Sequence, residues 1–84
     1  MNREQFNAKY SNWLKEGHYG LSLVNEEVIN YLDKEFQELI KIPDFKYLQI
    51  KSKFDWYCFY CENVSLEKRQ EIENKIKKIY DSRT

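Results

Sequence analysis

Apolar side chains recur at helical spacing near the start of the chain, between runs of polar residues. At i, i+4, i+7 and i+8 stand Phe6, Tyr10, Trp13 and Leu14. Residues with this spacing gather on one face of a helix, so the pattern predicts a first helix over residues 3–16. Gly17 occupies the place of a left-handed helix-terminating residue, and the stretch GHYG at 17–20 predicts a connecting turn.

A wider apolar stripe predicts a second helix. Asn25 is a favourable N-cap, and Glu26 and Glu27 follow it where the helix dipole favours negative charge. The stripe consists of Val28, Ile29, Leu32, Phe36, Leu39 and Ile40. Pro43 disfavours helical geometry at the residue before it, so we expect this helix to end near Lys41.

Residues 45–52 and 56–63 are rich in β-branched and aromatic side chains, which predicts two strands. The connection between them is short, so we expect an antiparallel hairpin. Ser65 is the predicted N-cap of a last helix. The apolar side of that helix consists of Leu66, Ile72, Ile76, Ile79 and Tyr80.

The predicted order of elements is α-α-β-β-α, which makes the fold class α+β. The chain has 84 residues, too few for a second core, so we predict a single domain over residues 1–84. A hairpin alone is marginally stable in water, so helices must cover one of its faces.

Side chains of a strand alternate between its two faces, which divides the aromatic residues of the hairpin. In the second strand, one face carries Trp56, Cys58 and Tyr60, and the other carries Tyr57, Phe59 and Cys61. In the first strand, Leu48 and Ile50 share one face, and the opposite face carries Phe45, Tyr47, Gln49, Lys51 and Lys53. Because both faces carry rings, either the helices sandwich the sheet or its outer face is an amphipathic patch of Tyr and Lys. Three helices of about four turns cannot easily wrap both faces, so we expect some exposure.

Cys58 and Cys61 form a C-x-x-C pair, the spacing of many zinc and redox sites. Positions three apart on a strand point to opposite faces, so in an extended segment the two thiols cannot form a disulfide or bind one ion. A tetrahedral metal site would need two further ligands, and the chain has one histidine, His18. We therefore expect inert thiols, no metal site and no cofactor.

Net charge and hydropathy limit the classes of partner that the sequence predicts. Fourteen Lys and Arg residues balance fourteen Asp and Glu residues, so no global field attracts nucleic acid or anionic membrane. No segment approaches the roughly 18 apolar residues of a membrane span, and the N-terminus lacks a signal-peptide pattern. We expect no membrane association and a cytoplasmic location.

Catalysis is not predicted. An enzyme needs a nucleophile, a base or a metal held in a cleft. His18 lies in the predicted turn, where a polar surface role is expected, and the carboxylates of the second helix lie on its polar side. We assign no catalytic residue.

The hairpin is the predicted interaction surface, because Tyr and Trp dominate interface hot spots. Arg69 falls inside the apolar stripe of the last helix. It either lays its stem on the core edge with the guanidinium in water, or pairs with a carboxylate or phosphate of a partner. The candidate partner-binding residues are Phe45, Tyr47, Lys51, Lys53, Trp56, Tyr57, Tyr60 and Arg69.

Two classes of partner remain open. The leading hypothesis is a protein, either a second copy of the chain, through the hairpin face or a free strand edge, or a larger factor. The alternative is a nucleic acid or nucleotide, with bases stacked on the rings and lysines on the phosphates.

The run QIKSKF at residues 49–54, followed by FY at 59–60, resembles small uncharacterised proteins of phages and bacterial genomes. In these a Q-[IV]-K-x-K-F-G-x-L-R-F-Y hairpin follows one amphipathic helix and precedes another, and the resemblance spans residues 28–84. Asp55 stands where the pattern has Gly, so the turn type does not carry over. Family members often continue into a cysteine knuckle, whereas this sequence stops at Thr84, so metal binding by a knuckle does not carry over either.

The resemblance implies an origin and no activity. It suggests an accessory protein of a phage or mobile element, located in the host cytoplasm. Proteins of that kind and size often bind and block a host factor, such as a component of a defence system. The sequence therefore predicts a non-enzymatic module for protein–protein interaction.

Overall fold

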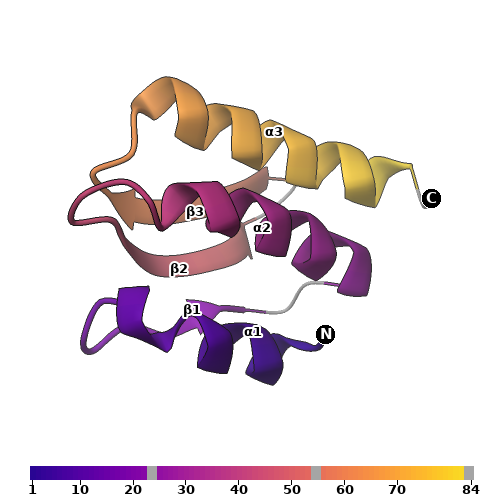
Figure 1. The fold of residues 1–84 in the computed structure, drawn as a ribbon. Coiled ribbons are helices and arrows are strands. Elements are labelled where there is room, and N and C mark those ends of the chain that lie inside the picture. The colour runs from indigo at the N-terminus through magenta and orange to yellow at the C-terminus, as the bar shows by residue number, and fades with distance from the viewer. Residues whose placement is uncertain (23–24, 54–55, 83–84) are drawn as a thin grey trace.

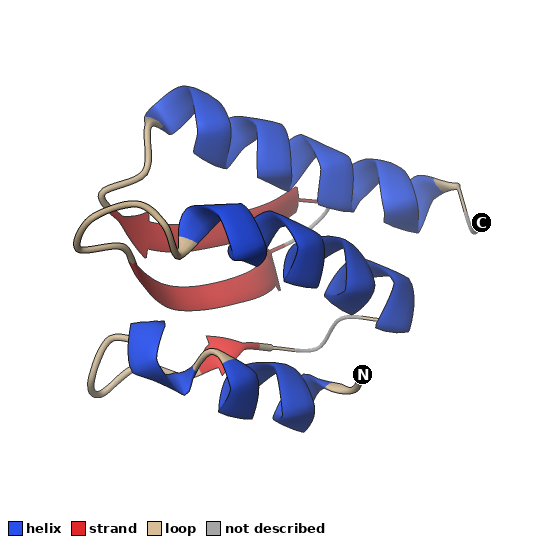
Figure 2. Ribbon diagram, in the orientation of Figure 1, coloured by secondary structure: helices blue, strands red, loops and turns tan. Residues whose placement is uncertain are grey.

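The protein consists of one layer of helices packed against one face of a sheet, with α2 (Glu26–Leu39) between α1 (Arg3–Lys9) and α3 (Leu66–Asp81) (Figures 1 and 2). The computed structural model describes residues 1–22, 25–53 and 56–82. Over these residues it shows three α-helices and a three-stranded sheet, so the predicted α+β class is confirmed. No helix in the described part of the chain has the length and apolar character needed to cross a membrane.

The predicted caps start both long helices. The Asn25 side chain accepts a hydrogen bond from the Val28 amide at 2.9 Å, and the Ser65 hydroxyl accepts one from the Lys68 amide at 3.1 Å. Each bond satisfies an amide that has no partner within its helix. α2 ends at Leu39, close to the predicted end.

The first helix is shorter than the sequence predicts. The prediction of a helix over residues 3–16 is wrong beyond Lys9, because α1 ends there and a short 3-10 helix, η1 (Ser11–Trp13), follows. Leu14 is extended and forms a parallel bridge with Tyr47 of the sheet. The backbone of this segment thus pairs with a distant strand, which helical spacing does not reveal.

The strands lie in the order β1-β2-β3. β2 (Lys46–Lys53) and β3 (Trp56–Glu62) pair antiparallel, as predicted, and the turn residues 54–55 lie outside the described residues. β1 (Gly20–Leu21) pairs parallel with β2. The sequence does not predict β1, because two residues are too few to show alternation. Gly17 has the predicted left-handed backbone, at φ 84°. The turn it belongs to leads to β1, which begins at Gly20.

A bulge at Leu48 changes the pattern of β2. Tyr47 and Gln49 pair with neighbouring residues of β3, so Leu48 is an extra residue without a pairing partner. Both Tyr47 and Ile50 therefore face the helices, and each has 0% exposure. The predictions that Leu48 shares a face with Ile50, and that Tyr47 lies opposite it, are wrong for this reason.

The bulge also corrects two candidate partner-binding residues. Phe45 and Tyr47 belong to the buried core instead of an outer face. The Phe45 ring lies 5.5 Å from the Phe36 ring of α2, and the Tyr47 ring lies 5.0 Å from it. Both rings point toward α2, so a partner cannot reach them on the folded protein.

The ring of Phe36 forms the centre of the core. Its centroid lies between 4.9 and 5.9 Å from the centroids of five other rings, which come from α1, the start of β2 and β3. Such aromatic pairs contribute about 0.5–1.5 kcal/mol each beyond the area they bury. The five rings are Phe6, Tyr10, Phe45, Tyr47 and Phe59.

Replacing Phe36 by Ala should lower the free energy of unfolding by about 3–5 kcal/mol, because a buried ring is lost and a cavity remains among its neighbours. Urea denaturation followed by tryptophan fluorescence measures the change. Leu66→Ala is the control, because Leu66 is 58% exposed on α3 and its loss should cost less than about 0.5 kcal/mol. Equal losses in the two variants would contradict the central place of Phe36.

Candidate functional site

β3 alternates as predicted, and this leaves one face of the sheet open. Phe59 is buried, and Tyr57 and Cys61 pack against the core. Trp56 and Tyr60 point to the opposite side, away from the helix layer, and are exposed. We call this side the open face. Its central residues are Leu48, Gln49, Lys51, Trp56, Cys58 and Tyr60.

The open face combines rings with positive charge. Trp56 is 46% exposed and Tyr60 is 38% exposed, although both are large hydrophobic residues. The Lys51 ammonium lies 5.6 Å from the centroid of the Tyr60 ring, within range of a cation–π interaction. Exposed rings beside a cation favour a surface that binds a partner.

The remaining candidate residues lie elsewhere. Tyr57 faces the helices, and its ring stacks on Tyr80 of α3 at 4.6 Å with an angle of 8° between the planes. The prediction that Tyr57 contacts a partner is therefore wrong for a partner on the open face. The side chain of Lys53 lies outside the described residues. Arg69 is half-buried on α3, with a buried Nε, so its stem lies on the core edge.

A side chain from α1 covers the outer edge of β1. The Asn7 amide oxygen accepts a hydrogen bond from the Leu21 amide at 3.0 Å, and its amide nitrogen donates to the Leu21 carbonyl at 3.3 Å. Asn7 thus makes the two bonds that a neighbouring strand would make. An added strand cannot pair with β1 here unless Asn7 is displaced.

A carboxylate from α3 covers the other edge of the sheet. Glu73 Oε2 accepts a hydrogen bond from the Phe59 amide at 2.8 Å. This amide points away from β2, where an added strand would bind it. Covered edges protect a sheet from pairing with other chains, so the open face, and not an edge, is the surface available to a partner.

Sequence reasoning does not predict the roles of Asn7 and Glu73. Each contacts a backbone group 14 residues away in the sequence, across an intervening turn. Asn7 and Glu73 are ordinary polar residues of amphipathic helices in the sequence. Their function depends on how the helices dock, which no local pattern encodes.

The two cysteines diverge, as predicted from strand geometry. Both are free thiols, with Cys58 on the open face and Cys61 against the core. Burial raises the pKa of the Cys61 thiol from 9.0 to about 11, and the nearby charge of Arg69 only partly opposes this effect. At neutral pH Cys61 is therefore protonated and weakly nucleophilic. The described residues contain no group of three or more His, Cys, Asp or Glu side chains that could hold a metal ion.

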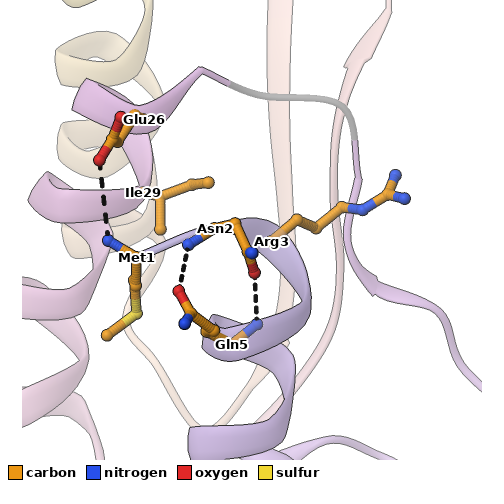
Figure 3. A pocket seen from close by; sticks show the side chains of 6 residues that line it. All are labelled: Met1, Asn2, Arg3, Gln5, Glu26 and Ile29. Carbon is orange, nitrogen blue, oxygen red and sulfur yellow. Dashed lines mark hydrogen bonds and ion pairs between the residues drawn. The ribbon is translucent and has the colours of Figure 1, made fainter.

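The concave sites are shallow, with linings of mixed polar and apolar character. One cavity of about 470 Å³ lies between the start of α1 and the start of α2 (Figure 3). Its side chains bond to one another: the Met1 ammonium lies 3.9 Å from Glu26, and Asn2 and Gln5 form a reciprocal capping box. No nucleophile and base converge there, and His18 is exposed in the turn before β1. The geometry offers no catalytic constellation in this cavity.

Comparison of the chain with protein-family models, with curated proteins and with solved structures found no match. The function must be inferred from the open face and the residues around it.

Replacing Glu73 by Ala should lower the free energy of unfolding by about 1–3 kcal/mol, because the buried Phe59 amide loses its acceptor. Hydrogen exchange measured by NMR should show faster exchange at Phe59. Glu71→Ala is the control on the same helix, since Glu71 forms a surface ion pair with Lys68 at 3.8 Å. Unchanged exchange at Phe59 would show that Glu73 does not protect this edge.

The Cys58→Ser variant retains only the Cys61 thiol, which should react with Ellman's reagent at pH 8 at least about tenfold more slowly in the folded protein than in guanidinium chloride. The raised pKa of Cys61 also has a consequence for stability. The folded protein holds this proton more tightly than the unfolded chain, so the contribution of Cys61 to the free energy of unfolding is constant below pH 9 and decreases as the pH rises toward 11. Cys61→Ala should weaken that decrease. Rapid labelling of folded Cys61 would contradict its burial.

Proposed function

We propose that this protein is a non-enzymatic protein-binding module whose open face docks on a larger partner. The observation that carries the proposal is the exposure of Trp56 and Tyr60 on a face that none of the helices in the described residues covers. Tyr and Trp anchors supply a disproportionate share of binding energy in protein interfaces. Both side chains point away from the buried core, on the side of β3 opposite Phe59.

The size of the open face favours a larger partner over a second copy of the chain. Strands of 7 and 8 residues are about 25 Å long, and three strands are about 14 Å wide, which gives at most roughly 350 Å² in projection. Two such faces together give about 700 Å² of projected area, a small contact region beside the roughly 1,200–2,000 Å² of accessible surface that stable interfaces bury. A larger protein can also contact the surfaces beside the sheet.

The covered edges argue in the same direction. Self-association of small sheet proteins commonly uses an unpaired strand edge. Here Asn7 and Glu73 occupy backbone groups at the two edges. Self-association would have to use a small face or sheet edges that side chains already cover. Binding to another protein is therefore the better-supported form of the proposal.

The hairpin motif suggests which class of partner this is. Residues 49–54 and 59–60 resemble small proteins of phages and bacterial genomes. We therefore propose that the chain is an accessory protein of a phage or mobile element. Its partner is a host protein met in the host cytoplasm, such as a component of a defence system, which the bound module inhibits.

Single-stranded nucleic acid is a second candidate, favoured by one observation. The Lys51 ammonium lies over the Tyr60 ring next to the exposed Trp56, which combines stacking surface with positive charge. Against it, the Lys46 ammonium is engaged by the Asn12 carbonyl at 2.8 Å, and the net charge of the chain is zero. A strand-binding groove needs more free cations along the backbone path.

The Trp56→Ala and Tyr60→Ala variants should each weaken binding of the partner by about thirtyfold, because each removes an anchor worth about 2 kcal/mol. Affinity capture from host lysate with wild-type protein, followed by titration of the captured protein, measures the loss. Leu66→Ala removes an exposed apolar side chain far from the open face and should leave binding unchanged.

Two results would overturn the proposal. One is capture that is equally strong for wild type and for the Trp56→Ala, Tyr60→Ala double variant. The other is salt-dependent binding of a ten-nucleotide single strand that requires both rings, which would promote the second candidate. Light scattering at high concentration checks the expected monomer.

A further inference from the structure

Arg69 of α3 lies beside the edge of β3, next to the open face. Glu73, one helical turn further along α3, binds the Phe59 amide at 2.8 Å and so fixes α3 against this edge. One helical turn rises about 5.4 Å and two strand residues span about 6.6 Å. Since α3 runs back along β3 (Figure 1), Arg69 is placed next to Cys61 and Tyr60.

One nitrogen of the Arg69 guanidinium has no hydrogen-bond partner in the described part of the chain. This nitrogen is Nε, and it is buried. The ion pairs that α3 forms within the described part of the chain use Lys68 and Lys77 instead. Buried donors without a partner are rare in native proteins, and a bound group or a water usually completes them.

A second cation lies on the other side of Tyr60. The Lys51 ammonium is 5.6 Å from the centroid of that ring. The pKa of Tyr60 is raised, first by its hydrogen bond with Cys58 and also by the charge of Glu73, while the charge of Arg69 acts in the opposite direction. Tyr60 is thus flanked by cations from β2 and α3.

The nearby carboxylates already have partners. Glu73 accepts the Phe59 amide, and Glu62, at the end of β3, forms an ion pair with Lys15 at 3.1 Å. Glu73 keeps its negative charge one turn from Arg69, so Arg69 and Lys51 (+2) and Glu73 (−1) leave this corner with a net charge of +1. A ligand that fits it must supply negative charge beside an aromatic ring.

We infer that Arg69 and Lys51 bind a carboxylate of the partner protein, from an Asp or Glu side chain next to the apolar residues that cover Trp56 and Tyr60. This inference rests on the proposed function. A guanidinium offers several donors in a plane that matches a carboxylate, and a charged pair strengthens when a partner excludes water. The carboxylate of the partner would accept the hydrogen bond that Arg69 Nε does not donate to any described residue.

A carboxylate fits this corner better than the phosphates of a nucleic acid. Two cations flanking one ring match a single compact anion. A nucleic acid presents phosphates in a row, and binding sites for it follow that row with many Lys and Arg side chains. Lys46, the other lysine of β2 whose side chain is described, is turned to the Asn12 carbonyl and does not extend the row.

The test uses a displayed library of random twelve-residue peptides, panned on wild-type protein. We expect enriched peptides to carry Asp or Glu within a few positions of an aromatic or aliphatic residue. Arg69→Gln should weaken these peptides by about ten- to a hundredfold, and Arg69→Lys should recover part of the loss, because Lys keeps the charge without the planar donors. Lys75→Gln is the matched control, since it removes one charge from the same helix in the groove toward α2.

A spectroscopic readout keeps the test valid if Arg69→Gln folds poorly. The Arg69 Nε–H resonance in the ¹H–¹⁵N spectrum of wild-type protein should shift when the best acidic peptide is added. It should not shift when the same peptide with Gln in place of Glu and Asn in place of Asp is added.

Three other outcomes of the peptide experiment distinguish the carboxylate inference from the proposed protein-binding function. Enriched peptides without acidic residues, which need Trp56 but not Arg69, would overturn this inference and leave the proposed function standing. A library with no peptide enriched over the Trp56→Ala variant would overturn both. Binding of a ten-nucleotide single strand that is lost in Arg69→Gln would replace the carboxylate by a phosphate.

Discussion

The position of Phe36 on α2 determines the arrangement of the whole molecule. One side chain contacts rings from α1, from the start of β2 and from β3, so three distant parts of the chain meet at one point. A single helix that supplies the centre of the core draws all packing to its own side of the sheet. The opposite side of the sheet is therefore left open by the helices of the described residues, so the position of the open face follows from where the core lies.

Local signals in the sequence were sufficient for the elements they govern. The Asn25 and Ser65 caps, and the alternation along β3 that separates Trp56 and Tyr60 from Phe59, were predicted correctly, because each depends on neighbouring residues. The errors occur where distant segments pair. α1 stops early because Leu14 bridges to the sheet, and β1 is too short to leave a periodic trace.

The candidate site likewise combines residues placed by local sequence signals with residues placed by contacts between distant segments. Lys51, Trp56 and Tyr60 lie on the open face because undisturbed alternation puts them there. The bulge at Leu48 moved Tyr47 into the core, and a bulge depends on the pairing register, which composition does not fix. The roles of Asn7, Glu73 and Arg69 arise from helix docking, so only the folded arrangement identifies them.

The alternation along β3 also puts strongly and weakly constrained positions side by side in one strand. Phe59 is locked among other rings, whereas its neighbours Cys58 and Tyr60 do not pack against the buried cluster. Substitutions at the outward positions can therefore accumulate with little effect on folding. The inward half of the same strand is restricted to apolar side chains that fit the core.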